Sequence, residues 1–235
     1  YRAAREELAQ ASRLGSIGQI TAGVAHEINQ PVAAIRSFAE NAQGFLARDD
    51  GARAEENLGR IVDLTQRIGT ITAELRDFAR RRTPEIGAVA VDAVIESTLL
   101  LIGDRLRAQG VTLERQGDTG LQVTADRVRL EQILINLIQN ALDALAERDG
   151  AVIRITTAHV GGQVTIEVAD NGPGVAPALA DELFMPFVTG RAEGLGLGLP
   201  IARNIAREFG GELRLAPSPL DGAAFMIELR EVARD

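Results

Sequence analysis

Apolar residues in the first third of the chain recur with the period of an α-helix packed along one seam. In the segment 54–80 the steps between successive apolar positions are three or four residues. These positions are Leu58, Ile61, Leu64, Ile68, Ile71, Leu75 and Phe78. Segment 3–48 follows a similar pattern, and Gly51 interrupts it. A single antiparallel hairpin cannot bury such a seam, so the sequence predicts a dimeric four-helix bundle.

The pattern changes in the segment 80–88, where three arginines precede Pro84 and Gly87. Arginines suit the last turn of a helix, whereas proline and glycine mark a linker. We therefore expect an all-α helical hairpin over 1–82, a linker over 83–90 and a second domain over 91–235. Expected helices of the second domain are 91–107, 126–147 and 198–209, and expected strands are 111–116, 121–125, 151–160, 163–170, 211–217 and 223–230. Helices alternating with antiparallel strand pairs predict an α+β two-layer sandwich.

Composition excludes several classes of function. The net charge of −8 argues against a nucleic-acid binder, and the absence of cysteine excludes disulfides and thiol chemistry. The chain contains no lysine, which a P-loop requires. His26 and His159 are far apart and lack cysteine partners, so a zinc site is not expected. His159 is interpreted as a solvated loop residue.

Polar residues form one stripe on the otherwise apolar segment 131–147. They recur at steps of four, three and four residues, at Asn136, Asn140, Asp143 and Glu147. A buried amide needs a hydrogen-bond partner or a ligand. The stripe is therefore either a ladder satisfied by the backbone or a set of amide oxygens that face a hard cation such as Mg²⁺.

Two glycine-rich segments follow apolar runs. In "VADNGPGV" (168–175) an expected strand ends at Asp170, and Gly172 and Gly174 follow. This is either an ordinary turn or a carboxylate that accepts a hydrogen bond from an amine, with glycines that admit a planar base. In "EGLGLGLPIARNIAREFGG" (193–211) alternate glycines lead into a helix, whose first N–H groups suit an anion.

In this order and spacing, the three segments resemble the N, G1 and G2 boxes of the gyrase, Hsp90, histidine-kinase and MutL (GHKL-type) ATPases. The segment between them resembles a lid, and its "LFMPFVTG" (183–190) resembles the F box. By this resemblance Asp170 reads adenine, Asn140 ligates Mg²⁺, and the glycines hold the phosphates of ATP. The residues expected at ATP are Asn136, Asn140, Asp170, Gly172, Gly174, Phe187, Arg191, Gly194, Leu195, Gly196, Leu197 and Gly198.

Asn136 stands where ATP-hydrolysing members of the superfamily carry a glutamate that activates water. An amide does not accept a proton from water near neutral pH. By this resemblance the site is suited to hold ATP for another nucleophile, as in histidine kinases.

"HEINQP" (26–31) resembles the H box of a sensor histidine kinase. The resemblance implies that His26 attacks the γ-phosphorus of ATP and that Glu27 fixes the imidazole tautomer. Gln30 occupies the position at which many members place a shorter Thr or Asn for phosphatase action. Pro31 removes a helical N–H next to His26, and we hypothesise a signalling hinge there. The hypothesis fails if Pro31→Ala leaves stimulus-dependent autophosphorylation of the full-length protein unchanged.

The resemblance extends from about residue 12 to 230, and segment 11–42 is similar to the C4-dicarboxylate transport sensors. It implies an ATP-dependent protein-histidine kinase that forms a homodimer and passes the phosphoryl group to an aspartate of a separate response regulator. It also implies a cytoplasmic fragment, with any anchor in the bacterial inner membrane N-terminal to Tyr1. Two alternatives stay open: a GHKL-type ATPase or clamp without histidine phosphorylation, and a non-catalytic dimerisation module. The sequence leaves phosphorylation in cis or in trans undecided.

Overall fold

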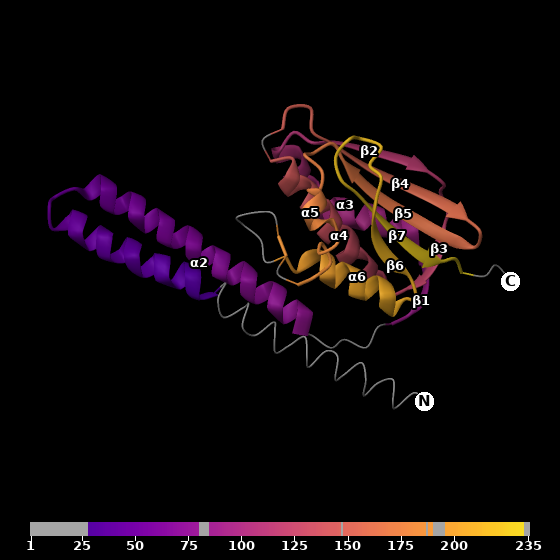
Figure 1. Ribbon diagram of the computed structural model, residues 1–235, viewed down its shortest axis with the longest axis horizontal. Coiled ribbons are helices and arrows are strands. Elements are labelled where there is room, and N and C mark those ends of the chain that lie inside the picture. Colours follow the sequence, from indigo (N-terminus) through magenta and orange to yellow (C-terminus); the bar gives the residue numbers. More distant parts are fainter. Residues whose placement is uncertain (1–27, 80–84, 147, 187, 190–195, 233–235) are drawn as a thin grey trace. The chain divides into compact units, whose positions relative to one another are not determined.

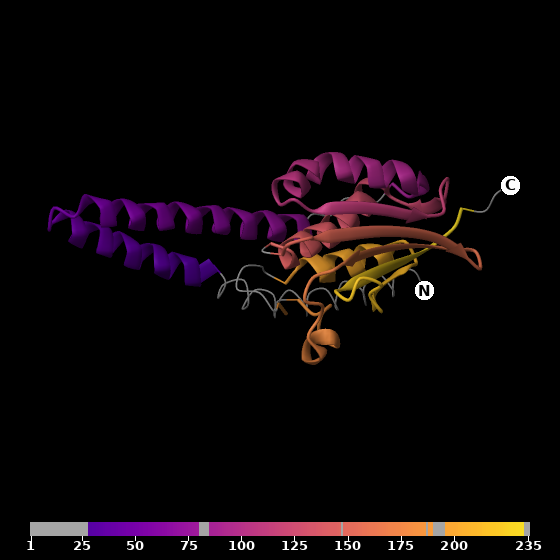
Figure 2. The same cartoon turned by 90° about the horizontal axis from the view of Figure 1, so that it is seen from above.

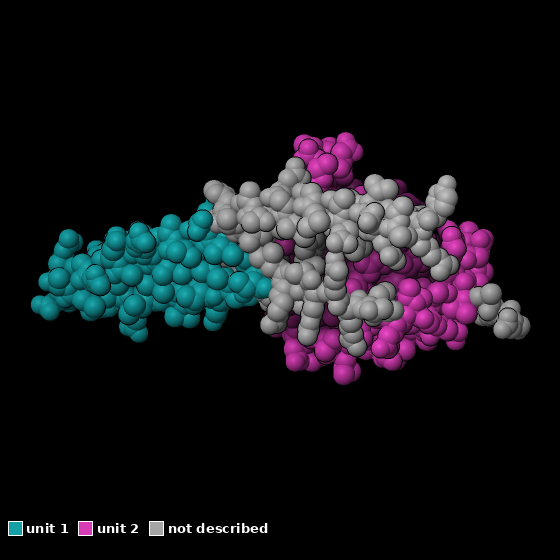
Figure 3. Space-filling model, turned by 90° about the horizontal axis from the view of Figure 1, so that it is seen from below, with its two compact units in different colours: residues 1–81 teal, residues 82–235 magenta. Residues whose placement is uncertain are grey.

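The computed structural model describes residues 28–79, 85–146, 148–186, 188–189 and 196–232. The chain divides into two compact units, 1–81 and 82–235 (Figure 3). No helix in the described part of the chain is both long enough and apolar enough to cross a membrane.

The first unit is a helical hairpin (Figures 1 and 2). Residues 28–46 are helical, and α2 (Gly51–Ala79) returns beside them. The turn passes through Asp49, whose φ is +58°, a conformation that aspartate adopts more readily than most residues. Asp50 then accepts a hydrogen bond from the N–H of Arg53 at 3.3 Å, as an N-cap does. The predicted interruption at Gly51 is therefore the start of α2.

Arginines of α2 lie over phenylalanines of the opposing helix. Arg53 stands 5.6 Å from the ring centroid of Phe45, and Arg60 stands 5.5 Å from that of Phe38. Such cation–π contacts fix the register of the two helices. Several large apolar side chains of the hairpin nevertheless stay exposed: Val32, Leu46, Leu58 and Val62. The hairpin therefore leaves part of its apolar surface uncovered.

The second unit contains a five-stranded sheet in the order β2-β4-β5-β7-β6. The strands are β2 (Thr112–Gly117), β4 (Val152–Val160), β5 (Gln163–Asp170), β7 (Ala224–Arg230) and β6 (Glu212–Ala216). β2 pairs with β4 in parallel, and all other pairs are antiparallel. A separate ribbon joins β1 (Gly87–Ala90) to β3 (Gln122–Ala125).

Helices cover one face of this sheet (Figures 1 and 2). They are α3 (Val91–Ala108), α4 (Arg127–Ala144) and α6 (Gly198–Glu208), and a single-turn helix α5 (Pro177–Ala180) follows β5. Strand residues that face the helices are buried, whereas the alternate residues are partly exposed and mostly polar, as in a two-layer sandwich. Ile133, Leu134 and Ile138 of α4 have no exposed surface and form the centre of the core.

The predicted fold class is confirmed, with two local differences and one local agreement. β1 lies within the segment 83–90 that we interpreted as a linker, because only Val89 of its four residues is buried and the alternation is weak. β2 pairs with β4 in parallel, whereas we expected antiparallel pairs. No local sequence pattern indicates a parallel partner that lies this far along the chain. The turn between β4 and β5 is the predicted one, and both Gly161 and Gly162 have positive φ.

The pKa values of two glutamates in the sheet are shifted in opposite directions. Burial raises the pKa of Glu167 above its ordinary value of 4.5, although Arg154 and Arg214 partly offset the effect. Burial also acts on Glu212, but hydrogen bonds from Arg203 and Arg207 together with their charges outweigh it, so the pKa of Glu212 is lowered.

We expect Glu167→Gln to stabilise the protein at pH 7 and to have a much smaller effect well below pH 4.5. A raised pKa means that the folded state disfavours the ionised carboxylate, so its removal helps only where that carboxylate is ionised. Glu212→Gln is the matched comparison and should destabilise at pH 7, with the loss shrinking as the pH falls through the lowered pKa. Urea unfolding at both pH values measures these differences, and a destabilising Glu167→Gln at pH 7 would contradict the assignment.

Candidate functional site

Asp170 is the last residue of the central strand β5, and its side chain is buried. One carboxylate oxygen, Oδ1, accepts hydrogen bonds from the N–H of Gly172 at 2.8 Å and of Ala223 at 3.2 Å. The backbone of Asp170 also donates to the carbonyl of Ala223 at 2.8 Å. These bonds hold the carboxylate plane in one orientation, as a group that recognises a base requires.

Glycines around Asp170 keep the backbone close to its carboxylate. A Cβ on Gly172 would lie 2.8 Å from Oδ1 of Asp170. A Cβ on Gly222 would lie 2.2 Å from the carbonyl oxygen of Asp170 and 2.6 Å from Oδ1. Gly174 has φ +75°, which favours glycine. Gly172 and Gly174 were expected here, and by the family resemblance so was the segment "GAAF" (222–225), which stands near the adenine pocket where members usually carry "GT-F". The close approach of Gly222 to Asp170 is found only in the structure.

Asn136 joins α4 to the start of α6. Its Nδ2 donates to the carbonyl oxygen of Gly198 at 3.1 Å. Gly198 is the first residue of α6, so this amide sets where the first turn of α6 lies relative to α4. Two alternatives were open for the polar stripe: hydrogen bonding to the backbone, or binding of a cation. The amide nitrogen of Asn136 is hydrogen-bonded to the backbone.

The start of α6 is suited to bind an anion. Its N-cap residue, Leu197, is fully buried and makes no side-chain hydrogen bond to the first turn. Pro200 lies in that turn, where its missing N–H costs little. Gly196 has φ +64°, and a Cβ there would lie 2.5 Å from the carbonyl oxygen of Val188. The predicted glycine-led helix is thus present, and Gly196 is required on steric grounds.

Asn140 and Asp143 differ in their surroundings. Asn140 is half-buried one turn after Asn136 and on the same side of α4. Asp143 is exposed and forms an ion pair with Arg105 of α3. Asp143 therefore links two helices. Asn140 stays a predicted ligand of a hard cation.

Phe184 connects the segment after β5 to the sheet and to α6. Its ring meets that of Phe225 edge to face, with centroids 6.5 Å apart. The guanidinium of Arg203 lies 4.5 Å from the centroid of Phe184, and Glu212 accepts a hydrogen bond from its Nε at 2.6 Å. These contacts fix the part of the predicted F box that the structure describes.

We expect Phe184→Leu and Arg203→Met to be energetically coupled by about 0.5–1 kcal/mol, the usual strength of a partly exposed cation–π contact. Urea unfolding of the two single variants and the double variant measures this coupling. Arg207→Met is the matched control, because Arg207 also binds Glu212 at 3.0 Å, yet only Arg203 is found over the ring. Strict additivity of Phe184→Leu with Arg203→Met would contradict the contact.

Several predicted site residues lie outside the described residues: His26, Glu27, Phe187, Arg191, Gly194, Leu195 and the stripe residue Glu147. Gln30 is described and is exposed on the helix 28–46. The structure thus brings Asn136 of α4 to Gly198 at the start of α6, and it brings Gly172 to Asp170 and to Ala144 at the C-terminal end of α4.

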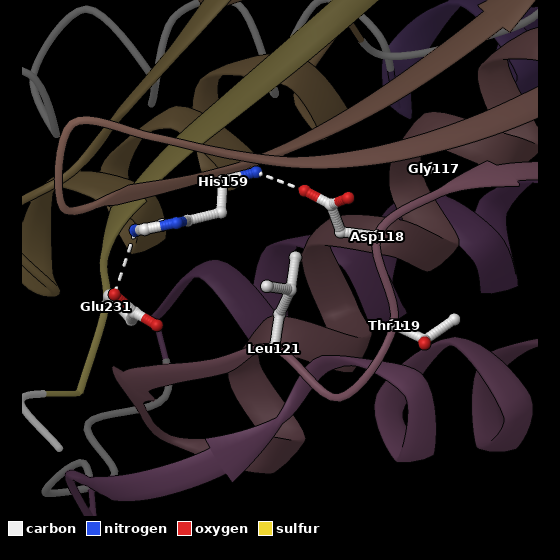
Figure 4. A pocket seen from close by; sticks show the side chains of 6 residues that line it. All are labelled: Gly117, Asp118, Thr119, Leu121, His159 and Glu231. Carbon is white, nitrogen blue, oxygen red and sulfur yellow. Dashed lines mark hydrogen bonds and ion pairs between the residues drawn. The ribbon is translucent and has the colours of Figure 1, made fainter.

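A hollow lies at the end of β5 opposite to Asp170 (Figure 4). It has a volume of about 690 Å³ and is lined by Gly117, Asp118, Thr119, Leu121, His159 and Glu231. Nε2 of His159 lies 2.9 Å from a carboxylate oxygen of Glu231, and the N–H of His159 donates to Asp118 at 2.9 Å. His159 therefore holds the end of the last strand in place, and it is not merely solvated as we expected.

Two protein families match the chain. Residues 16–84 match the His Kinase A (phospho-acceptor) domain. Residues 125–233 match the histidine kinase-, DNA gyrase B- and HSP90-like ATPases. Together these matches cover both the hairpin and the unit that contains Asn136 and Asp170.

The C4-dicarboxylate transport sensor protein DctB of Rhizobium meliloti (strain 1021) is 44% identical over 231 residues, which are 97% of this chain and 37% of that protein. The chain therefore spans less than half of the length of this relative. A crystal structure of histidine kinase ThkA in complex with response regulator protein TrrA is 29% identical with a TM-score of 0.81, covering 97% of this chain and 66% of that one. The catalytic domain of ThkA alone is 30% identical with a TM-score of 0.58, covering 63% of this chain and 96% of that one.

Proposed function

Because this chain belongs to the sensor histidine kinase family, we propose that it transfers the γ-phosphoryl group of ATP to its own His26. The observation that carries the proposal is the identity of Asn136. An amide here donates to Gly198, and an amide does not act as a base toward water. The site would therefore keep ATP intact until an imidazole reaches it.

In the proposed reaction Nε2 of His26 attacks the γ-phosphorus, and the bond from that phosphorus to the bridging oxygen of ADP breaks. Glu27 would accept a hydrogen bond from Nδ1–H and would stabilise the positive charge that forms on the ring. Asp170 would accept a hydrogen bond from the adenine amine, since its carboxylate is already oriented by Gly172 and Ala223.

Phosphate binding would fall to the start of α6. The first N–H groups of α6 lack a side-chain cap, and they suit the phosphates of ATP. Gly196 and Gly198 would let the phosphates approach the backbone. Arg191 would add a charged group in the segment before α6.

Mg²⁺ fits the residues present. In sites for nucleotides this ion takes few protein ligands, and phosphate oxygens and water complete its shell. Asn140 offers one amide oxygen at the half-buried face of α4. The ion would supply positive charge that offsets the charge on the transferring phosphoryl group.

A homodimer through the hairpin is part of this proposal. The hairpin exposes large apolar side chains, and a second copy of the hairpin would bury them. The second copy carries the same helical spacing of apolar residues, so the two hairpins can pack symmetrically. The exposed residues in question are Val32, Leu46, Leu58 and Val62. ThkA forms a complex with a response regulator, and we infer a receiver domain as the partner that takes the phosphoryl group from His26.

The test is incubation of the purified chain with γ-labelled ATP and magnesium, then with candidate response regulators. We expect label on the chain that is stable to alkali and lost in acid, followed by transfer to an aspartate of one regulator. Release of labelled phosphate with none retained on the protein would favour an ATPase or clamp. Failure to bind ATP would favour a dimerisation module without catalysis.

A further inference from the structure

Asp126 makes two backbone contacts from one buried carboxylate. It lies between β3 and α4, and it is 6% exposed. Oδ1 accepts from the N–H of Arg129 at 3.1 Å, which is the N-cap contact of α4. Oδ2 accepts from the N–H of Glu85 at 2.8 Å, 41 residues earlier in the chain. The first contact joins residues three apart in the sequence, whereas the second joins residues 41 apart.

Glu85 belongs to the segment through which the chain enters the second unit. Two residues later β1 begins, and its first residue, Gly87, pairs with Ala125, the residue before Asp126. The entering segment is thus held to β3 by the ladder and to the start of α4 by Oδ2. A displacement of Glu85 therefore acts on the residue that caps α4.

Helix α4 connects the capping residue Asp126 to the residues proposed to contact the nucleotide. Asn136 and Asn140 lie ten and fourteen residues after Asp126, which corresponds to about 15 and 21 Å along a helix. The core-facing residues of α4 are buried, and a closely packed helix is expected to pass a shift of its first turn along its length. A change at its first turn thus reaches the amides of Asn136 and Asn140.

We propose that Asp126 is a positioning residue that couples the entering segment at Glu85 to nucleotide binding on α4. This inference shares one assumption with the proposed function, namely that the bound nucleotide is ATP. Coupling between two sites is reciprocal. If the contact to Glu85 favours the binding geometry of α4, bound nucleotide must strengthen that contact by the same factor.

Amide hydrogen exchange at Glu85 tests this in the whole chain. A non-hydrolysable ATP analogue with magnesium should slow exchange of the Glu85 N–H by about fivefold, the low end of usual couplings. In Asp126→Asn the amide oxygen can still cap α4, whereas the new NH₂ group faces the N–H of Glu85 and cannot accept from it. The nucleotide-dependent protection should therefore vanish in this variant.

The same factor should appear in the affinity for the analogue. Asp126→Asn and Glu85→Pro, which removes the N–H itself, should each weaken binding by about fivefold, and the double variant should be no weaker than either. Asp92→Asn is the control. Asp92 likewise accepts from a backbone N–H, that of Gly120 at 2.7 Å, but it lies on α3, beyond the end of β1 that is opposite to Glu85.

Equal exchange at Glu85 with and without the analogue overturns the inference, as does an Asp126→Asn variant that keeps the protection. The inference is also overturned if the fold-losses in affinity of the two single variants multiply in the double variant. That result would mean that the two substitutions act independently. None of these measurements needs phosphorylation. A chain that binds the analogue and never labels His26 would therefore refute the proposed function and leave this inference to be decided by its own results.

Discussion

Replacing His26 with glutamine removes the acid-labile label from γ-labelled ATP, with a loss of at least about 10³-fold in phosphorylation. Glutamine has neither a nucleophilic ring nitrogen nor a group that forms a phosphoramidate. Nucleotide affinity should stay within about twofold, because His26 lies in the phospho-acceptor segment 16–84 and the proposed ATP contacts lie within 125–233. Autoradiography after alkaline gel electrophoresis measures the label, and a labelled ATP analogue measures the affinity.

The chain supplies its own control for this experiment, since it has only two histidines. His159→Gln removes the other imidazole, which pairs with Glu231 in the hollow at the far end of β5. This variant should keep its phosphorylation. Label that survives in His26→Gln and disappears in His159→Gln would place the phosphoryl group on the wrong residue and refute the proposed reaction.

The second large effect is expected at Asp170. In Asp170→Asn the amide oxygen can keep the hydrogen bonds from Gly172 and Ala223, so the fold should persist. The second position now carries an NH₂ donor in place of a charged acceptor. A lost hydrogen bond to a charged group corresponds to about 1.5–3 kcal/mol, or about 10- to 100-fold in the affinity for ATP.

Base selectivity provides an independent readout at the same position. A donor at residue 170 opposes the amine of adenine and suits the keto oxygen of guanine, so the preference for ATP over GTP should narrow. Asp118→Asn is the matched control, because Asp118 also accepts from a backbone N–H, that of His159, yet lies in the hollow at the far end of β5. An Asp170→Asn variant with unchanged affinity and unchanged selectivity is incompatible with a role in adenine recognition.

The parts of the site that could be predicted are those with local chemistry. Asp126 follows a strand and precedes an apolar helix, and the structure has it as the N-cap. Asp170 with Gly172 and Gly174 follows an alternating strand, and these residues do gather at its end. In each case neighbouring residues in the sequence are enough to produce the contact.

The missed features all depend on residues distant in sequence. Gly222 is required because its backbone lies against Asp170, 52 positions earlier. The family resemblance placed the segment 222–225 near the adenine pocket, but it did not show this steric need for a glycine. The contact of Asp126 with Glu85 spans 41 residues. The parallel pairing of β2 with β4 likewise brings together strands separated by β3 and α4. Pattern reasoning identifies elements, and only the folded chain shows which backbone groups meet.

The position of β5 has a consequence for inhibitors. β5 is bonded to β4 on one side and to β7 on the other, so it is among the last strands of the sheet to open. Its final residue, Asp170, is fixed by two further bonds from the backbone. A small molecule with an amidine or aminopyrimidine group would therefore meet a preorganised receptor at this end, with little ordering required of the protein.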